Sequence, residues 1–302
     1  MKQVLFVTAV TFLVVFLVTG FQSIGAQDGL ALMKVEPAAR PSGMGGAFVS
    51  IIGDPNSAAY NPAGAVSVPQ FAVSFGHNTY WSNINIETGY FATPLTGRFF
   101  IHGGLKYASV DDIESRLAPT LEPDALFESR DISFKGGLAW RFSDRLSAGF
   151  GVGWFMEKIG EWSGSTVTAD IGVALVASSA ISLGASATSL GSDFALKLDG
   201  NPDSDKISLP TIYRMGGSYR YDKYLGVADV VIVDDKAHLH VGAEADLKDN
   251  FSIRSGYMLG YDSKNFAAGA SFARRNFTFD YAFVPYSNDL GTSHLFNLTV
   301  ML

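Results

Sequence analysis

The chain has no cysteine among its 302 residues and no long apolar run beyond its N-terminus. The first absence excludes disulfides and thiolate chemistry, and it is compatible with an oxidising compartment. The second excludes a helical membrane protein, because a spanning helix needs roughly 20 consecutive apolar residues. Basic patches and basic helices are also absent, and the net charge is -7. We therefore expect no nucleic acid partner.

Short alternating segments rich in glycine and aromatic residues fill most of the sequence. From residue 69 to residue 302 the apolar residues recur with a period of two, in what we count as fourteen strands. Successive side chains of a strand point to opposite faces, so each strand has one apolar and one polar or small face. A soluble β-sandwich also alternates in this way. A typical strand places Phe277, Phe279, Tyr281 and Phe283 opposite Thr278, Asp280 and Ala282.

The connections between these strands alternate in length. Longer connections include residues 109–129 and 189–206. An outer-membrane barrel has short periplasmic turns on one rim and longer loops on the other, whereas a soluble sandwich has no reason to keep this parity. The sequence therefore predicts an all-β fold, a 14-stranded antiparallel transmembrane β-barrel with both ends on the periplasmic side. The short connections are 94–97, 143–145, 178–179, 222–223, 248–250 and 275–276.

Residues 1–26 have the features of a cleaved signal peptide. Lys2 is followed by an apolar core over 4–18 and by small residues at 24–26. An uncleaved membrane anchor is the alternative, but the apolar core is short for that role. We expect export to the bacterial outer membrane, with outer-membrane lipid and the barrel-assembly machinery as partners.

Residues 27–68 differ from the alternating region that follows. They are rich in small residues and weakly charged, so we expect them to pack against other parts of the chain and not to be disordered. Asp54-Pro55 and Asn61-Pro62 each resemble an N-cap followed by proline at the first helical position. Two short helical turns are predicted here, and Gly64 is placed to end the second.

Several residues of the predicted barrel are expected to face its lumen. His238, His240, Glu244 and Asp246 share one strand face. Two imidazoles at this spacing can share a transition metal, but no third ligand is identifiable, so we favour a polar lumen lining without a metal or other cofactor. His102 and Lys106 are interpreted in the same way.

Apolar and small residues are also expected inside. Leu225, Val227 and Val231 would face the lumen beside Asp229. This arrangement suits a packed plug or a hydrophobic ligand, and a bulge misplaced in the strand assignment is the third alternative. Gly149, Gly151 and Gly153 line one face of a strand, where missing side chains allow another backbone to come close.

Catalytic motifs are not found. The sequence has no Gly-x-Ser-x-Gly elbow and no Ser/His/Asp set whose spacing supports a triad. The glycines at 43, 45 and 46 lack the strand-turn-helix context of a dinucleotide site. We do not expect an enzyme.

Two stretches resemble a known group of proteins. The run from Arg40 to Phe48 and the run from Asn61 to Gly64 are similar to the N-terminal signature of the PorV/PorQ group, itself similar to a branch of the FadL-like family of fourteen-stranded barrels. The C-terminal stretch from Phe251 onward also resembles this group, although Leu302 stands where these barrels usually end in an aromatic residue. The residues that carry the N-terminal resemblance include Gly43, Gly45, Gly46, Asn61, Pro62, Ala63 and Gly64.

This resemblance implies that residues 27–68 form a hatch inside the barrel formed by residues 69–302, with 61–63 at its inner part and with the residues of the signature in gating. In PorV-like proteins the barrel serves type IX secretion, so our main prediction is an accessory role in delivering secreted proteins to the cell surface. In FadL-like proteins the hatch gates hydrophobic small molecules, which can leave laterally through the wall. A FadL-like gated channel is the alternative prediction. The expected partners are accordingly secreted proteins or hydrophobic small molecules.

Overall fold

A computed structural model describes residues 31–80, 84–198, 201–202, 204–248 and 250–302. The predicted signal peptide and the first residues of the predicted hatch lie outside this part of the chain. Within the described residues, no helix has the length and apolar character needed to cross a membrane.

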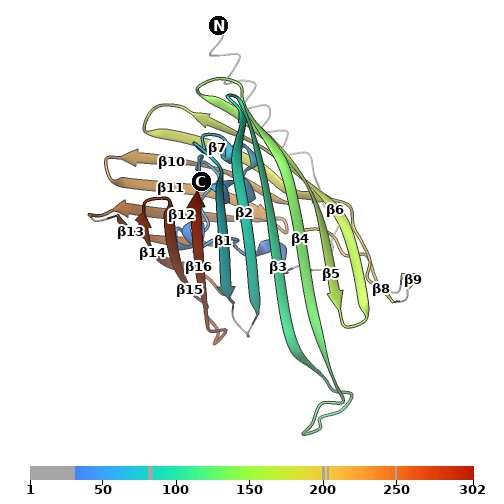
Figure 1. Ribbon diagram of the computed structural model, residues 1–302. Helices are drawn as coiled ribbons and strands as arrows, with labels where there is room; N and C mark the ends of the chain where they lie inside the picture. Colours follow the sequence, from blue (N-terminus) through green and yellow to red (C-terminus); the bar gives the residue numbers. More distant parts are fainter. Residues whose placement is uncertain (1–30, 81–83, 199–200, 203, 249) are drawn as a thin grey trace.

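Fourteen long antiparallel strands form a closed barrel, as the sequence predicted (Figure 1). Barrel strands that follow one another in the chain are paired, and the pairing of β1 with β16 completes the ring. The two-residue strands β8 and β9 form a small hairpin beside β6. The strands are β1 (Ala72–Thr79), β2 (Asn85–Thr96), β3 (Phe99–Ser115), β4 (Ala125–Arg141), β5 (Leu146–Ile159), β6 (Trp162–Val176), β7 (Ile181–Gly191), β8 (Lys197–Leu198), β9 (Asn201–Pro202), β10 (Ile212–Tyr221), β11 (Tyr224–Val233), β12 (Lys236–Asp246), β13 (Phe251–Leu259), β14 (Phe266–Arg274), β15 (Phe277–Pro285) and β16 (Thr292–Met301).

Five of the six predicted short connections lie between consecutive barrel strands as predicted. The sixth, 94–97, is shifted, because β2 continues to Thr96 and the turn to β3 follows it. Three of these turns contain a residue in the left-handed region, Asp222, Asn250 and Arg275, which allows the chain to reverse within a few residues. The C-terminus lies at this short-turn rim, and the β3–β4 hairpin projects from the opposite end (Figure 1). By the rule for outer-membrane barrels, the short-turn rim is periplasmic and the hairpin points outward.

One predicted loop was wrong. Residues 109–129 were expected to be a long connection, but β3 continues to Ser115 and β4 begins at Ala125. The ladder shifts register between Val110 and Ile113, where Asp112 adopts a φ of 56°. Charged residues interrupt the apolar alternation there, because this part of the hairpin no longer needs a lipid-facing side.

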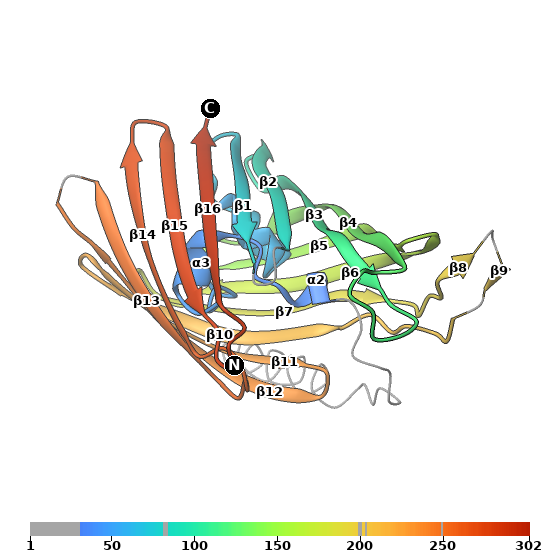
Figure 2. The same cartoon turned by 90° about the horizontal axis from the view of Figure 1, so that it is seen from below.

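The described part of the N-terminal segment, residues 31–68, lies inside the ring of strands (Figure 2). We refer to residues 31–68 as the hatch. Every residue from Pro41 to Ile51 is buried. Its helical elements are α2 (Ala31–Lys34), α3 (Ala39–Gly43) and the 3-10 helices η1 (Pro55–Ala59) and η2 (Pro62–Ala65).

Both predicted N-caps are confirmed. The Asp54 carboxylate accepts a hydrogen bond from the Asn56 amide at 2.9 Å, and Asn61 Oδ1 accepts one from the Ala63 amide at 3.0 Å. The second helix ends at Ala65 and not at Gly64. The Gly64 carbonyl instead accepts a hydrogen bond from the Gly53 amide at 3.0 Å, which ties the helix to the turn before η1.

The two faces of the strands follow the predicted alternation. On β15, Phe277 and Phe279 are exposed toward the lipid, and Asp280 and Ala282 are buried toward the hatch. On β11, Leu225 and Val227 are buried on the inner face, as expected. The barrel therefore presents an apolar exterior and encloses the hatch.

Candidate functional site

A network of buried charges joins the hatch to the wall. Arg40 of α3 donates from Nε and Nη2 to the Glu244 carboxylate on β12, at 3.0 and 2.8 Å, and forms an ion pair with Asp54 at 2.9 Å. Arg254 on β13 approaches the same carboxylate at 3.3 Å and pairs with Asp280 on β15 at 2.9 Å. Although burial opposes it, the charge of Glu244 raises the pKa of Arg40, so the guanidinium stays charged. These five side chains form the arginine network.

Three buried polar side chains, two from the wall and one from the hatch, bind backbone groups across the interface between the hatch and the wall. The Asp229 carboxylate accepts from the Phe48 and Val49 amides at 2.6 and 2.8 Å. The Asn61 amide group donates to the Val49 and Val173 carbonyls, both at 2.9 Å. Asn297 of β16 accepts from the Ala39 amide at 2.6 Å. The hatch is thus anchored on three different sectors of the wall.

Wall glycines allow the hatch backbone to lie directly on the strands. At each of five wall glycines, an added Cβ would lie less than 3.0 Å from a hatch atom. Real Cβ atoms essentially never come so close, so any larger residue there would displace the hatch or the strand. We call this set the glycine belt: Gly149, Gly172, Gly184, Gly242 and Gly256.

The sequence prediction for the glycines of β5 is confirmed only for Gly149, which faces Pro62 and Ala63. Gly151 lies near His102 and Asp170, and Gly153 lies near Lys135 and Thr168, so both make room for wall side chains and not for the hatch. The period of two places these three glycines on one face, but the hatch covers only the periplasmic end of that face.

The apolar residues inside the barrel pack on the hatch. Leu225 and Val227 share a buried cluster with Met44 and Phe48, and the Phe48 and Tyr60 rings lie 5.5 Å apart. Of the interpretations that the sequence left open for this face, the packed plug is therefore the one observed for Leu225 and Val227. Val231 lies farther along β11, in a separate cluster with Ile212 and Val233.

The first described residues of the hatch run along the outer half of the lumen. The Lys106 ammonium donates to the Leu32 and Val35 carbonyls at 2.8 and 2.7 Å. Next along the chain, Glu36 accepts a hydrogen bond from the Tyr60 hydroxyl. Burial, followed by the charge of Glu36, raises the pKa of Tyr60 well above its usual range, so the hydroxyl remains a donor.

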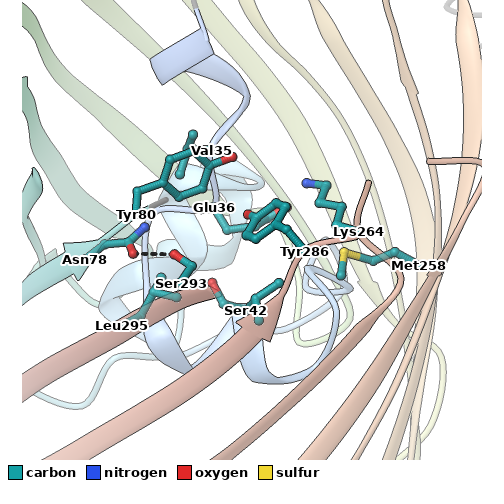
Figure 3. Close-up of a pocket in the computed structure, with 11 residues that line it drawn as sticks. Val35, Glu36, Ser42, Asn78, Tyr80, Met258, Lys264, Tyr286, Ser293 and Leu295 are labelled. Atoms are coloured by element: carbon teal, nitrogen blue, oxygen red, sulfur yellow. Dashed lines mark hydrogen bonds between the residues drawn. The ribbon is translucent and has the colours of Figure 1, made fainter. Parts of the chain in front are cut away.

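Residues 31–36, which we call the strip around Val35, lie between two small interior cavities. Cavity one holds about 20 Å³ and lies among Glu36, Tyr80, Lys264 and Tyr286 (Figure 3). Cavity two holds about 50 Å³ and is lined by Met33, Lys106, Lys135, Ser189 and Arg214, among others. Val35 lines both. A cavity of roughly 150 Å³ is needed for benzene, so neither accepts an aromatic solute in this closed conformation.

A larger groove of about 620 Å³ lies at the outer rim, between the β5–β6 connection and the segment that leads to β8. Met156 and Phe194 supply apolar surface, and Glu161, Asp193 and Lys197 supply charge. Phe194 also packs inward against Phe155, with ring centroids 6.0 Å apart, in a buried cluster that includes Leu32 and Met33.

The four predicted lumen-facing polar residues separate into three environments. His238 stacks on the Tyr261 ring at 3.8 Å, and His240 shares a hydrogen bond with the Tyr261 hydroxyl at 2.9 Å. Glu244 belongs to the arginine network. Asp246 lies at the short-turn rim with Arg220, 3.2 Å away. Among the described residues no group of three potential ligands could hold a metal ion.

Sequence reasoning missed Arg40, Arg254 and Asp280 as functional residues. A signal was present for the last two, because charges on the inner face of strands whose other face meets lipid need a partner inside. The partner could not be identified, since Arg40 and Glu244 are 204 residues apart in the chain.

Comparisons with known proteins support the fold at low sequence identity. No protein-family model matches the sequence, and no curated protein matches it either. Among solved structures, the Ralstonia pickettii toluene transporter TbuX superposes with a TM-score of 0.63 at 13% identity, covering 88% of this chain and 97% of that one. The Pseudomonas putida toluene transporter TodX gives 0.62 at 12%, with the same coverage.

A third structure, a Pseudomonas aeruginosa FadL homologue, gives a TM-score of 0.60 at 11% identity, covering 87% of this chain and 97% of that one. The chain therefore has the FadL-like 14-stranded outer-membrane β-barrel fold. At these sequence identities the likeness establishes the fold and nothing about the function. Membership of the PorV/PorQ group stays a prediction.

Proposed function

We propose that this protein is a gated outer-membrane channel for hydrophobic small molecules. The observation that carries the proposal is a continuous apolar line from the outer groove to the interior. Phe194 lines the groove and packs in the cluster that contains Met33, and Met33 lines cavity two. Among the described residues, this cluster of buried apolar side chains lies between the groove and cavity two.

The hatch provides the gate in this proposal. The signature residues Gly43, Gly45, Gly46 and 61–64 lie against the wall or within the turns that seat the hatch. Its attachment includes polar contacts, through the arginine network and the backbone anchors, beside the buried apolar clusters. The polar contacts can be replaced by contacts with water or with other polar groups. A hydrophobic solute would compete for the apolar surface of Met33 and Val35.

The β6–β7 seam offers an exit from cavity two. Strand pairing shifts between Ala169 and Ile171, and Ser189 adopts a φ of 61°. The Asp170 carboxylate accepts the Ser189 amide at 2.7 Å and pairs with Lys135 at 2.8 Å. Because a side chain replaces a ladder hydrogen bond here, this stretch of wall can open at lower cost than a regular ladder.

Uptake by proteoliposomes tests the proposal. The purified protein should accelerate uptake of a monoaromatic hydrocarbon over protein-free vesicles. Phe194→Ala should raise the rate severalfold by opening the groove, and Met33→Trp should lower it by filling the path. Leu198→Ala, at an exposed position of β8 outside the path, serves as the matched control. Equal uptake with and without protein would refute the channel function.

Protein secretion is a second candidate. It is motivated by the resemblance of 40–48 and 61–64 to the PorV/PorQ signature, and it is favoured by the long β3–β4 hairpin that extends outward from the barrel (Figure 1). A strain that lacks the protein should then lose secreted or surface-attached proteins. An unchanged profile of these proteins would contradict this candidate.

A further inference from the structure

We infer that the tip of the β3–β4 hairpin, residues 116–124, docks on a protein that presents an apolar pocket rimmed by lysine and arginine. This inference concerns a surface remote from the hatch and does not depend on the proposed channel function.

The tip exposes apolar side chains that the fold itself does not use. Leu117 is 93% exposed and Leu121 is 101% exposed, and Leu126 at the start of β4 is also exposed. The hairpin that carries them projects beyond the other connections at this end of the barrel (Figure 1). Leu117 and Leu121 are thus left almost bare by the described residues of the chain.

The tip is held in one conformation by its own hydrogen bonds. Arg116 donates to the Glu114 carboxylate at 3.1 and 2.7 Å and to the Thr120 carbonyl at 2.5 Å. The Asp124 carboxylate accepts from the Leu117 amide at 2.6 Å, and the Asp124 amide donates to the Ser115 carbonyl at 2.9 Å. These polar groups therefore form hydrogen bonds within the loop, while the leucines are exposed. A preorganised turn loses less conformational entropy on binding.

The charge around the leucines defines the chemistry of the partner. Residues 111–130 contain six acidic residues and two arginines. Asp112 and Glu122 have no basic partner among the described residues. An anionic membrane surface would repel this tip, and so would the same tip of a second copy. A protein surface with a basic rim and an apolar centre complements both the charge and the leucines.

Burial of the leucines would dominate the affinity. Complete burial of one leucine changes a binding constant by roughly tenfold or more. The acidic rim would speed the encounter, and reversal of its charge would set like charges against the basic rim of the partner and lower the affinity strongly.

Because the chain has no cysteine, Ala118→Cys, at an exposed position between the two leucines, introduces a unique thiol that reports occupancy. We expect a membrane-impermeant maleimide to label it at least about tenfold more slowly in intact cells than in purified protein. Ser287→Cys, at an exposed position in the β15–β16 connection, is the control and should react equally in both. Asp112→Lys combined with Glu122→Lys should restore labelling in cells. Equal labelling of Ala118→Cys in both settings would overturn the inference.

A photo-crosslinker in place of Leu117 distinguishes the occupants. A protein adduct that disappears in the charge-reversed variant supports the inference. An adduct with lipid, an adduct with a second copy of this chain, or a protein adduct that charge reversal leaves unchanged would each overturn it. Hydrocarbon uptake by proteoliposomes of Ala118→Cys is expected to equal that of the unmodified protein, which separates this surface from the channel.

Discussion

At the scale of single residues, the position of the hatch depends on glycines in the wall and on a few buried charged side chains. The glycine belt removes the Cβ atoms that would keep the two backbones apart. The arginine network then fixes the orientation of the hatch relative to the wall, because each guanidinium binds its carboxylates in one geometry.

Gly256→Val should dislodge the hatch. A Cβ at this position would lie less than 3.0 Å from the Gly45 amide nitrogen and the Met44 carbonyl carbon, and neither backbone group can rotate away. We expect destabilisation of about 1–3 kcal/mol and frequent open events in planar-bilayer recordings. Gly136→Val, where an added Cβ meets nothing within 4 Å, should keep the closed trace. Similar recordings from both variants would contradict this assignment of the belt.

Arg40→Met should loosen the hatch further. It removes the partner of Glu244 and Asp54 and leaves two carboxylates desolvated, at an expected cost of about 3 kcal/mol. Hydrogen exchange at the α3 amides should rise accordingly. Arg220→Met breaks the exposed pair with Asp246, whose side chains are 43% and 48% exposed, and should change stability by less than about 1 kcal/mol. Equal effects of the two changes would show that the network does not hold the hatch.

At the scale of elements, the strip around Val35 is the part of the hatch nearest the outer surface. It divides cavity one from cavity two, and its carbonyls are held by one ammonium group, that of Lys106. A movement of this short strip would join the two cavities without unfolding α3, η1 or η2.

Lys106→Met should release this strip. The two carbonyls lose their donor, so the strip separates from β3 more often, and hydrocarbon uptake by proteoliposomes should rise severalfold. Lys158→Met on β5 serves as the control, because Lys158 is exposed. A rate that falls below that of the unmodified protein would mean that Lys106 binds the solute and not the strip.

The elements themselves could be predicted because their signals are local. Alternation along 277–283 and turn residues such as Asp222 require only neighbouring positions, and both predictions are confirmed. The site could be predicted only in part. Asn61 was found through its proline-flanked cap, whereas the meeting of Arg40 with Glu244 depends on the strand registers of the closed barrel. The prediction of a loop over 109–129 was wrong because the charged residues of β3 and β4 beyond the lipid were interpreted as a loop.

At the scale of the whole molecule, the barrel wall and the hatch have separate tasks. The wall meets lipid with its exposed aromatic and aliphatic side chains, such as Phe277 and Phe296, and the hatch fills the lumen. The 14-stranded barrel was predictable from strand number and turn parity, whereas its FadL-like character was predicted only from a resemblance. The choice between solute and protein cargo was not, because the same plugged barrel serves both predictions.

Deletion of residues 31–68 should convert the closed barrel into an open pore. The strands pair with one another and not through the hatch, so the wall should persist. We expect a large, steady conductance in planar bilayers and sensitivity of cells to bulky hydrophilic antibiotics. A deletion variant that inserts into the membrane and remains closed would contradict the view that the hatch is the barrier.

The covalent link between the hatch and β1 has a consequence for biogenesis. β1 must pair with β16 to complete the ring, and Ala39 of the hatch bonds Asn297 of β16 on the inner side of that seam. The hatch ends at residue 68 and β1 begins at Ala72, so the hatch stays tethered beside this seam while the ring closes. The segment that blocks the mature pore is therefore also placed to hold β16 against β1 from the inside.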